Sequence, residues 1–87
     1  MNMPYIKQQD RDKFGTFVAS MTSLNINSPG ELNYLITMLT HRYLNMSPES
    51  YQMYNNALGA LEGAKLELYR RHIAIYENEK IKENGDV

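Results

Sequence analysis

Apolar residues recur at helical spacing in three stretches of the chain, and these stretches predict its helices. The first is a short helix over residues 10–22, with Asp10 placed to cap its N-terminus. Its apolar positions follow the i, i+3, i+4, i+7 pattern of one helix face, at Phe14, Phe17, Val18 and Met21. Residues 1–9 contain Pro4 and few core signals, which indicates an extended N-terminal arm.

A serine–proline pair marks the start of the second helix, which we expect over residues 28–44. Ser28 is suited to the N-cap, Pro29 to the first helical position, and Glu31 completes a capping box. The apolar stripe of this helix follows at Leu32, Leu35, Ile36, Leu39 and Tyr43.

Ser47 and Pro48 repeat the signal, and no proline follows them, so the sequence predicts one long helix over residues 48–83. At 1.5 Å per residue this helix would reach about 50 Å. Met46 and Tyr51 would form a hydrophobic staple at its start. Gly85 is suited to the left-handed position that ends a helix.

These elements predict an all-α fold in a single domain, residues 1–87. Because residues 45 and 46 form a short link, the two longer helices should form an antiparallel hairpin, with the short N-terminal helix packed on it. Gly59 and Gly63 lie four apart in the long helix. They suit close packing within the hairpin, and alternatively a bend or a docking point for another subunit.

The long helix carries more apolar surface than its own domain can cover. One stripe follows Tyr54, Leu58, Leu61, Leu68 and Ile75, and a second follows Leu66, Tyr69, Ile73 and Tyr76. The preceding helix is only ~24 Å long and cannot cover both stripes. We therefore expect a homo-oligomer, with a dimer as the commonest case, built on the second stripe. The competing expectation is that the helix breaks near Gly59 or Gly63 and folds back.

Composition and charge exclude several classes of function. The formal net charge is −1, so no strong field attracts nucleic acid or an anionic membrane. There is no cysteine, which excludes disulfides and thiolate metal sites. No apolar run approaches the ~20 residues of a membrane span, and no secretion signal begins the chain. We expect a soluble, cytoplasmic protein.

No catalytic constellation is visible in the sequence. The two histidines, His41 and His72, lack the spacing of metal ligands, and no glycine-rich phosphate loop occurs. We therefore expect no enzymatic activity, no metal and no cofactor.

Arg70, Arg71 and His72 form the densest cationic cluster. Glu67 precedes Arg71 by four positions, so an ion pair within the helix is the simplest interpretation. The alternative is an anion site, in which the arginines hold a phosphate or a carboxylate of a partner.

Four stretches together resemble a family of short, uncharacterised proteins from bacteriophages and bacteria. They are Met3-Pro4-Tyr5-Ile6-Lys7-Gln8, Pro29-Gly30-Glu31-Leu32-Asn33-Tyr34, Ala64-Lys65-Leu66-Glu67-Leu68-Tyr69-Arg70-Arg71 and Glu83-Asn84-Gly85-Asp86-Val87. The resemblance implies a phage or prophage origin, a host bacterial cytoplasm, and termini that belong to the domain. Tyr5 and Lys7 are thereby candidate partner-binding residues. The resemblance supplies no catalytic residue, cofactor or substrate.

Two functions remain open at this point. The first is a non-enzymatic, phage-derived interaction protein that self-associates and engages a host or phage macromolecule. The second is an oligomeric binder that sequesters a nucleotide-like anion with its arginines and tyrosines.

Overall fold

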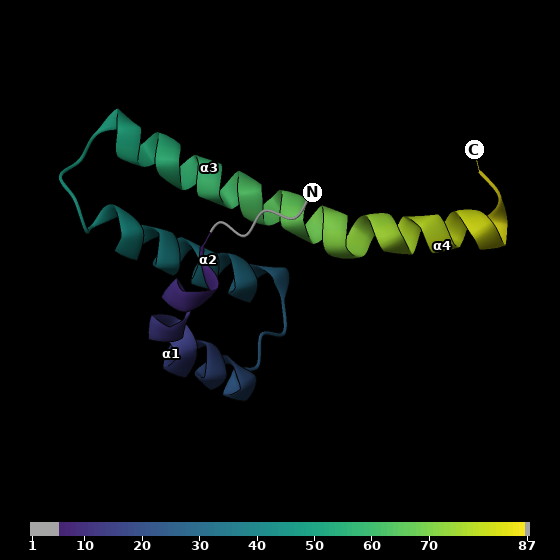
Figure 1. Ribbon diagram of the computed structural model, residues 1–87, viewed down its shortest axis with the longest axis horizontal. Helices are drawn as coiled ribbons and strands as arrows, with labels where there is room; N and C mark the ends of the chain where they lie inside the picture. The colour runs from purple at the N-terminus through teal and green to yellow at the C-terminus, as the bar shows by residue number, and fades with distance from the viewer. Residues whose placement is uncertain (1–5, 87) are drawn as a thin grey trace. The chain divides into compact units, whose positions relative to one another are not determined.

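The computed structural model describes residues 6–86, and within this range the chain is helical with no strand (Figure 1). The all-α class predicted from the sequence is thereby confirmed. The chain divides into two compact units, Met1–Asn33 and Tyr34–Val87. Tyr5 lies outside the described residues.

The first unit begins with a series of short helical turns. These are the 3₁₀ turns η1 (Gln8–Asp10) and η2 (Asp12–Phe14), the six-residue helix α1 (Gly15–Ser20) and the 3₁₀ turn η3 (Met21–Ser23). Within the stretch predicted as a helix over residues 10–22, regular α-helical winding is therefore confined to α1.

The expectation that Asp10 caps this stretch is wrong. Asp10 is the last residue of η1, and none of these turns has a side-chain cap. Their N–H groups bond instead to carbonyl oxygens three residues back, with Asp10 N donating to Lys7 O at 2.9 Å and Phe14 N to Arg11 O at 3.0 Å.

The helix α2 (Pro29–Leu44) starts as its sequence predicts. Glu31 N donates to Ser28 Oγ at 3.1 Å, which confirms Ser28 as the N-cap. The Glu31 carboxylate accepts from the backbone N–H of Asn27 at 2.7 Å. In a standard capping box that acceptor serves the cap residue itself, so the reciprocal bond is displaced by one residue.

The helix α3 (Tyr51–Leu68) starts three residues later than expected. Ser50, in an extended conformation, accepts a hydrogen bond from Met53 N at 3.1 Å, and Ser50 rather than Ser47 is therefore the N-cap. This start lets the Tyr54 hydroxyl donate to the Glu49 carboxylate, across the position of the cap.

The predicted hydrophobic staple is also absent at this start. Met46 is 62% exposed and Tyr51 is 88% exposed, because Tyr51 is now the first helical residue and not the fourth. The N′ and N4 positions are filled by Glu49 and Tyr54. Their hydrogen bond connects the two positions that a hydrophobic staple would connect by apolar contact.

The long helix is continuous from Tyr51 to Asn84, but its winding changes once. The α3 segment runs unbroken through Gly59 and Gly63, which rules out a break at either glycine in this structure. A five-residue π-helical segment, η4 (Tyr69–Ile73), follows, and α4 (Ala74–Asn84) completes the helix (Figure 1).

Gly85 ends the long helix with a positive φ of 84°, as its sequence position predicts. Its N–H donates to Ile81 O at 2.8 Å and so satisfies one of the last carbonyl groups. Its ψ of 157° is extended, so the chain leaves the helix directly.

Few side chains of the described residues are buried. Ala57, at 6% exposure, is the one buried apolar residue among them, and Gly63 is buried as well. A Cβ at Gly59 would meet no atom within 4 Å. Gly59 therefore has open space beside it, whereas Gly63, four residues later, is buried. Among the helices of the described residues, none has the length and apolar character needed to cross a membrane.

Candidate functional site

The π-helical segment η4 changes which residues share a face of the long helix. In a π turn each N–H bonds to the carbonyl five residues back instead of four, so the segment takes up one residue more than α-helix would. Residues after η4 therefore lag by one position, or about 100°. Two residues that are eight apart across η4 therefore have the angular separation of residues seven apart in a regular α-helix. Their side chains point in directions that differ by about 20° around the helix axis.

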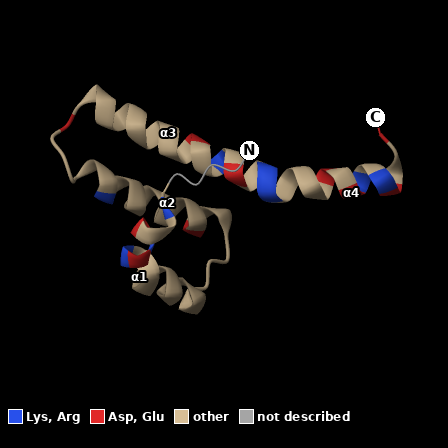
Figure 2. Ribbon diagram, viewed as in Figure 1, with Lys and Arg blue, Asp and Glu red and all other residues tan. Residues whose placement is uncertain are grey.

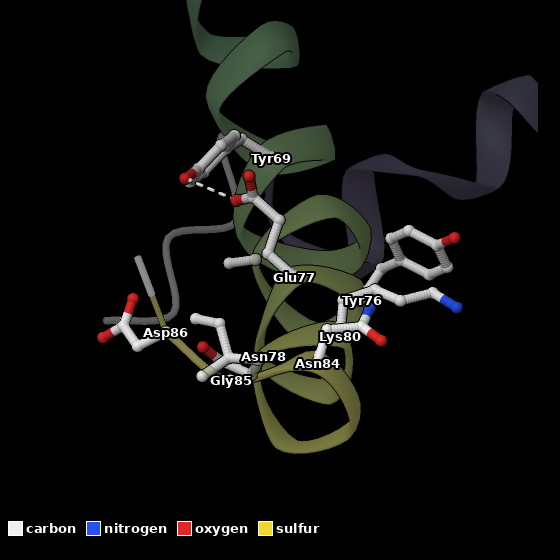
Figure 3. Close-up of a pocket in the computed structure, with 10 residues that line it drawn as sticks. Tyr69, Tyr76, Glu77, Asn78, Lys80, Asn84, Gly85 and Asp86 are labelled. Atoms are coloured by element: carbon white, nitrogen blue, oxygen red, sulfur yellow. Dashed lines mark hydrogen bonds between the residues drawn. The ribbon is translucent and has the colours of Figure 1, made fainter.

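A hydrogen bond between Tyr69 and Glu77 is direct evidence of this shift. The Tyr69 hydroxyl donates to Glu77 Oε1 at 2.9 Å, eight residues along the chain (Figure 3). In uninterrupted α-helix these two positions would diverge by about 80°. The hydrogen bond to the carboxylate, with its negative charge, raises the pKa of Tyr69 above its ordinary value of 10.0.

The same shift joins the two apolar stripes that the sequence predicts. Leu68 and Tyr76 are eight apart across η4 and so share a face, whereas Ile75 rotates away from it. We call the resulting face the exposed stripe, and it consists of Tyr54, Leu58, Leu61, Leu68, Tyr69, Ile73 and Tyr76. Its members are exposed, at 53% for Leu68, 40% for Ile73 and 59% for Tyr76. Leu66, which the sequence grouped with Tyr69 and Ile73, is 54% exposed and lies beside this stripe.

Glu67 holds both arginines of the cationic cluster. Arg70 Nη2 lies 2.7 Å from Glu67 Oε1, and Arg71 Nε lies 2.5 Å from Glu67 Oε2. The hydrogen bonds from Arg70 and then Arg71 lower the pKa of Glu67 below its ordinary value of 4.5. The ion pair within the helix that the sequence predicts is confirmed, and it includes Arg70 as well as Arg71.

This arrangement bears on the anion-site alternative. A phosphate bound by both arginines would have to displace a carboxylate that already receives a charge-assisted hydrogen bond on each oxygen. His72 follows Arg71 in η4 and is exposed. Lys7 belongs to the first unit, where it is the N-cap residue of η1 and exposed.

An open hollow lies along α4, and Figure 3 shows the Tyr69–Glu77 hydrogen bond at the upper end of the residues that line it. Its volume is about 570 Å³. It is lined by Tyr69, Ala74, Tyr76, Glu77, Asn78, Lys80, Ile81, Asn84, Gly85 and Asp86. The Lys80 ammonium lies 5.4 Å from the centre of the Tyr76 ring, and the two side chains extend together on one side of the helix.

A second hollow lies where α2 gives way to α3, and it contains the other histidine, His41. Its volume is about 470 Å³. It is lined by His41, Leu44, Asn45, Ser47, Glu49, Ser50, Met53 and Tyr54. The hydrogen bond to Glu49 is the main cause that raises the pKa of Tyr54 above 10.0.

Charge is unevenly distributed along the long helix (Figure 2). Residues 51–61 carry no charged side chain, whereas η4 and α4 carry charges of both signs. Within residues 6–86 there is no group of three or more His, Asp or Glu side chains that could hold a metal ion.

Sequence reasoning found the cationic cluster but missed η4 and the role of Glu77. Residues eight apart are not neighbours on any regular helix, so no periodic template pairs Tyr69 with Glu77. The Glu49–Tyr54 bond was missed because it depends on which of two serines caps α3.

The sequence pattern of one protein family matches residues 3–87, nearly the whole chain. The chain belongs to this family, described as domain of unknown function DUF6899. A comparison with curated proteins found no match, and a comparison with solved structures found none either. Family membership thus agrees with the resemblance to uncharacterised proteins and adds no activity to it.

Proposed function

We propose that this DUF6899 protein is a non-enzymatic interaction protein that associates with itself and then engages a host or phage macromolecule. The observation that carries the proposal is the exposed stripe on the long helix. A row of exposed apolar side chains on one helix face often marks a protein–protein interface. The polar groups beside it are engaged with one another, as in the Glu67 and Glu77 hydrogen bonds, and they form no acid–base pair aimed at a substrate.

The exposure of single side chains along the long helix supports self-association. Leu58 is 64% exposed, Leu68 53% and Tyr76 59%. Association of copies through the long helix would bury these side chains.

The hairpin of α2 and α3 is part of the same proposal. Residues 45–50 form a short connection, which favours antiparallel neighbours. On α2, Thr40 and Leu44 are four residues apart and are among its least exposed residues, and on α3 the same holds for Met53 and Ala57. Positions four apart lie on one face of a helix. Sixteen residues of α2 can flank only ~24 Å of a helix that runs for about 50 Å. The second half of the long helix therefore needs another partner.

The phage origin and the cytoplasmic setting are supported by the resemblance of the four sequence stretches alone. The alternative function, a binder of nucleotide-like anions, has no comparable support because Arg70 and Arg71 are already both paired with Glu67. A thermal-shift panel of nucleotides tests that alternative. Stabilisation that disappears when both arginines are changed to glutamine would revive it.

Light scattering of the purified protein at tens of micromolar tests the proposal. We expect a mass that is a multiple of 10.1 kDa. Ile73→Asp places a charge on the exposed stripe and should dissociate the oligomer. Ile75→Asp is the matched control, since Ile75 is 55% exposed but lies off the stripe. A monodisperse 10.1 kDa species in the wild type would overturn the proposal.

A further inference from the structure

We propose that two copies of the chain pair residues 65–84 of their long helices in antiparallel orientation, through the part of the exposed stripe that η4 creates. This inference rests on the proposed self-association and adds the orientation and the register of the interface. The partner that covers this part of the exposed stripe is a second copy of the same chain.

The large apolar side chains of residues 65–84 lie on the exposed stripe or beside it, with the exception of Ile75. Leu68, Ile73 and Tyr76 belong to the exposed stripe, and Ile81 continues beside them in α4 at 43% exposure. These residues lie beyond the ~24 Å that α2 can flank. Leu68 to Ile81 span 14 residues, or ~21 Å, which is long enough for a helix–helix interface of several turns.

The distribution of charge along the helix favours a second copy that runs in the opposite direction. Residues 65–72 carry three basic side chains, Lys65, Arg70 and Arg71, against one acid. Residues 77–83 carry three acids, Glu77, Glu79 and Glu83, against two lysines. An antiparallel pair lays the positive half of each helix along the negative half of the other, whereas a parallel pair sets like against like (Figure 2).

The positions of the apolar side chains determine the register of the two helices. When the two helices cross between Ala74 and Ile75, Leu68 of one copy is level with Ile81 of the other, and Ile73 is level with Tyr76. Sliding one copy by a helical turn sets Leu68 against Glu77 in one direction and Ile73 against Lys80 in the other. Both shifts place an apolar side chain against a charge, so the central register is favoured.

The same register gives Glu77 a partner from the second copy. Lys80 of one copy is level with Tyr69 of the other, and the Tyr69 hydroxyl is hydrogen-bonded to the Glu77 carboxylate. The Lys80 ammonium would therefore meet a carboxylate that the π-helical segment has turned onto the stripe. A buried carboxylate needs such a cation, so the pair explains how Glu77 is tolerated on an apolar face.

Cysteine cross-linking tests the orientation, because the chain has no cysteine of its own. The variants Leu68→Cys and Ile81→Cys are prepared separately, checked for oligomeric state by light scattering, and treated with a short thiol-reactive cross-linker alone and mixed. We expect cross-linking in the mixture and little in either variant alone. In the antiparallel pair, residue 68 of one copy lies 13 residues along the axis from residue 68 of the other, or about 20 Å, and the same holds for residue 81. A short cross-linker cannot span that distance.

A charge reversal tests the register independently. Lys80→Glu should weaken association about tenfold or more, because it sets the new carboxylate against Glu77 of the other copy. Lys82→Glu makes the same change of charge on the side of α4 that faces away from the stripe and should have little effect. Equal effects of the two substitutions would overturn the register.

The outcomes separate this inference from the proposed function. A wild-type monomer overturns both. An oligomer in which each cysteine variant cross-links with itself is parallel, and an oligomer with no cross-link in any sample uses another surface. Either result overturns the antiparallel pairing and leaves self-association standing.

Discussion

The Tyr69 hydroxyl and the Glu77 carboxylate meet at 2.9 Å although eight residues separate them along one helix. This contact depends on the π-helical winding of Tyr69–Ile73, which turns the residues that follow back by about 100°. π-Helical turns are rare and often occur at functional sites. Here the turn changes a helix with two separate apolar stripes into a helix with one.

The Tyr69–Glu77 bond can be tested by titration of tyrosine absorbance. The bond raises the pKa of Tyr69 above 10.0, so Glu77→Ala should bring the ionisation of one tyrosine to lower pH. Because the folded-state pKa is the higher one, the stabilisation is present below about pH 10 and is lost as the pH rises through the folded-state value. Glu79→Ala removes a neighbouring carboxylate and should leave the titration unchanged. Identical curves for Glu77→Ala and the wild type would contradict the bond.

Glu67 should make the stability of the protein sensitive to acid. Its two arginine partners lower its pKa below 4.5, so the stabilisation is present above about pH 4.5 and is lost as the pH falls through the lower folded-state pKa. We expect Glu67→Gln to reduce the loss of unfolding free energy between neutral and acidic pH, as measured by urea denaturation.

A matched control for this experiment is Glu62→Gln. It removes the longer ion pair with Lys65, at 3.7 Å between highly exposed side chains, and should leave the acid sensitivity in place. If the two variants lose the same part of the acid sensitivity, the effect does not come from the Glu67 site.

The start of α3 predicts different results for two nearby serines. Ser50→Ala removes the side-chain oxygen that accepts from Met53 N and should lower the free energy of unfolding by about 1 kcal/mol. Ser47→Ala should have little effect, because Ser47 lies outside the helix. Chemical denaturation of both variants measures the difference, and an equal or larger cost at Ser47 would move the start of the helix back to Pro48.

Two glycines of the long helix should respond to alanine in opposite ways. Gly59→Ala fills open space in a helix interior and should raise the free energy of unfolding by about 0.5–1 kcal/mol. Gly85→Ala places a side chain at φ 84° and should fray the last turn, with loss of the bond from residue 85 to Ile81 O.

Thermal denaturation measures the first effect, and amide hydrogen exchange at residues 81–85 measures the second. Destabilisation by Gly59→Ala would show that this glycine is packed closely against another helix. Unchanged exchange in Gly85→Ala would show that the positive φ is not required.

The sequence by itself determined the features that depend on neighbouring residues. Ser28 and Glu31 predict the start of α2, since a cap and its donor are three residues apart. Gly85 predicts the end of the long helix, since only glycine readily takes its φ. The i+3 and i+4 spacing also predicts the pairing of Glu67 with the arginines, because helical neighbours are near each other in any context.

Only the structure decided the start of α3, where two serines are equivalent capping signals. Only the structure decided which residues share a face of the long helix, because this depends on the exact winding of the helix. Ser47 and Ser50 are both competent caps, and the structure shows that Ser50 is the one that accepts from Met53 N, with the Glu49–Tyr54 bond formed across it. No residue type marks the π-helical segment, and the one additional residue only shifts the phase of the apolar pattern by about 100°, which in a regular helix is interpreted as two separate stripes. That one residue sets which apolar side chains share a face, and so the exposed stripe could be found only from three-dimensional coordinates.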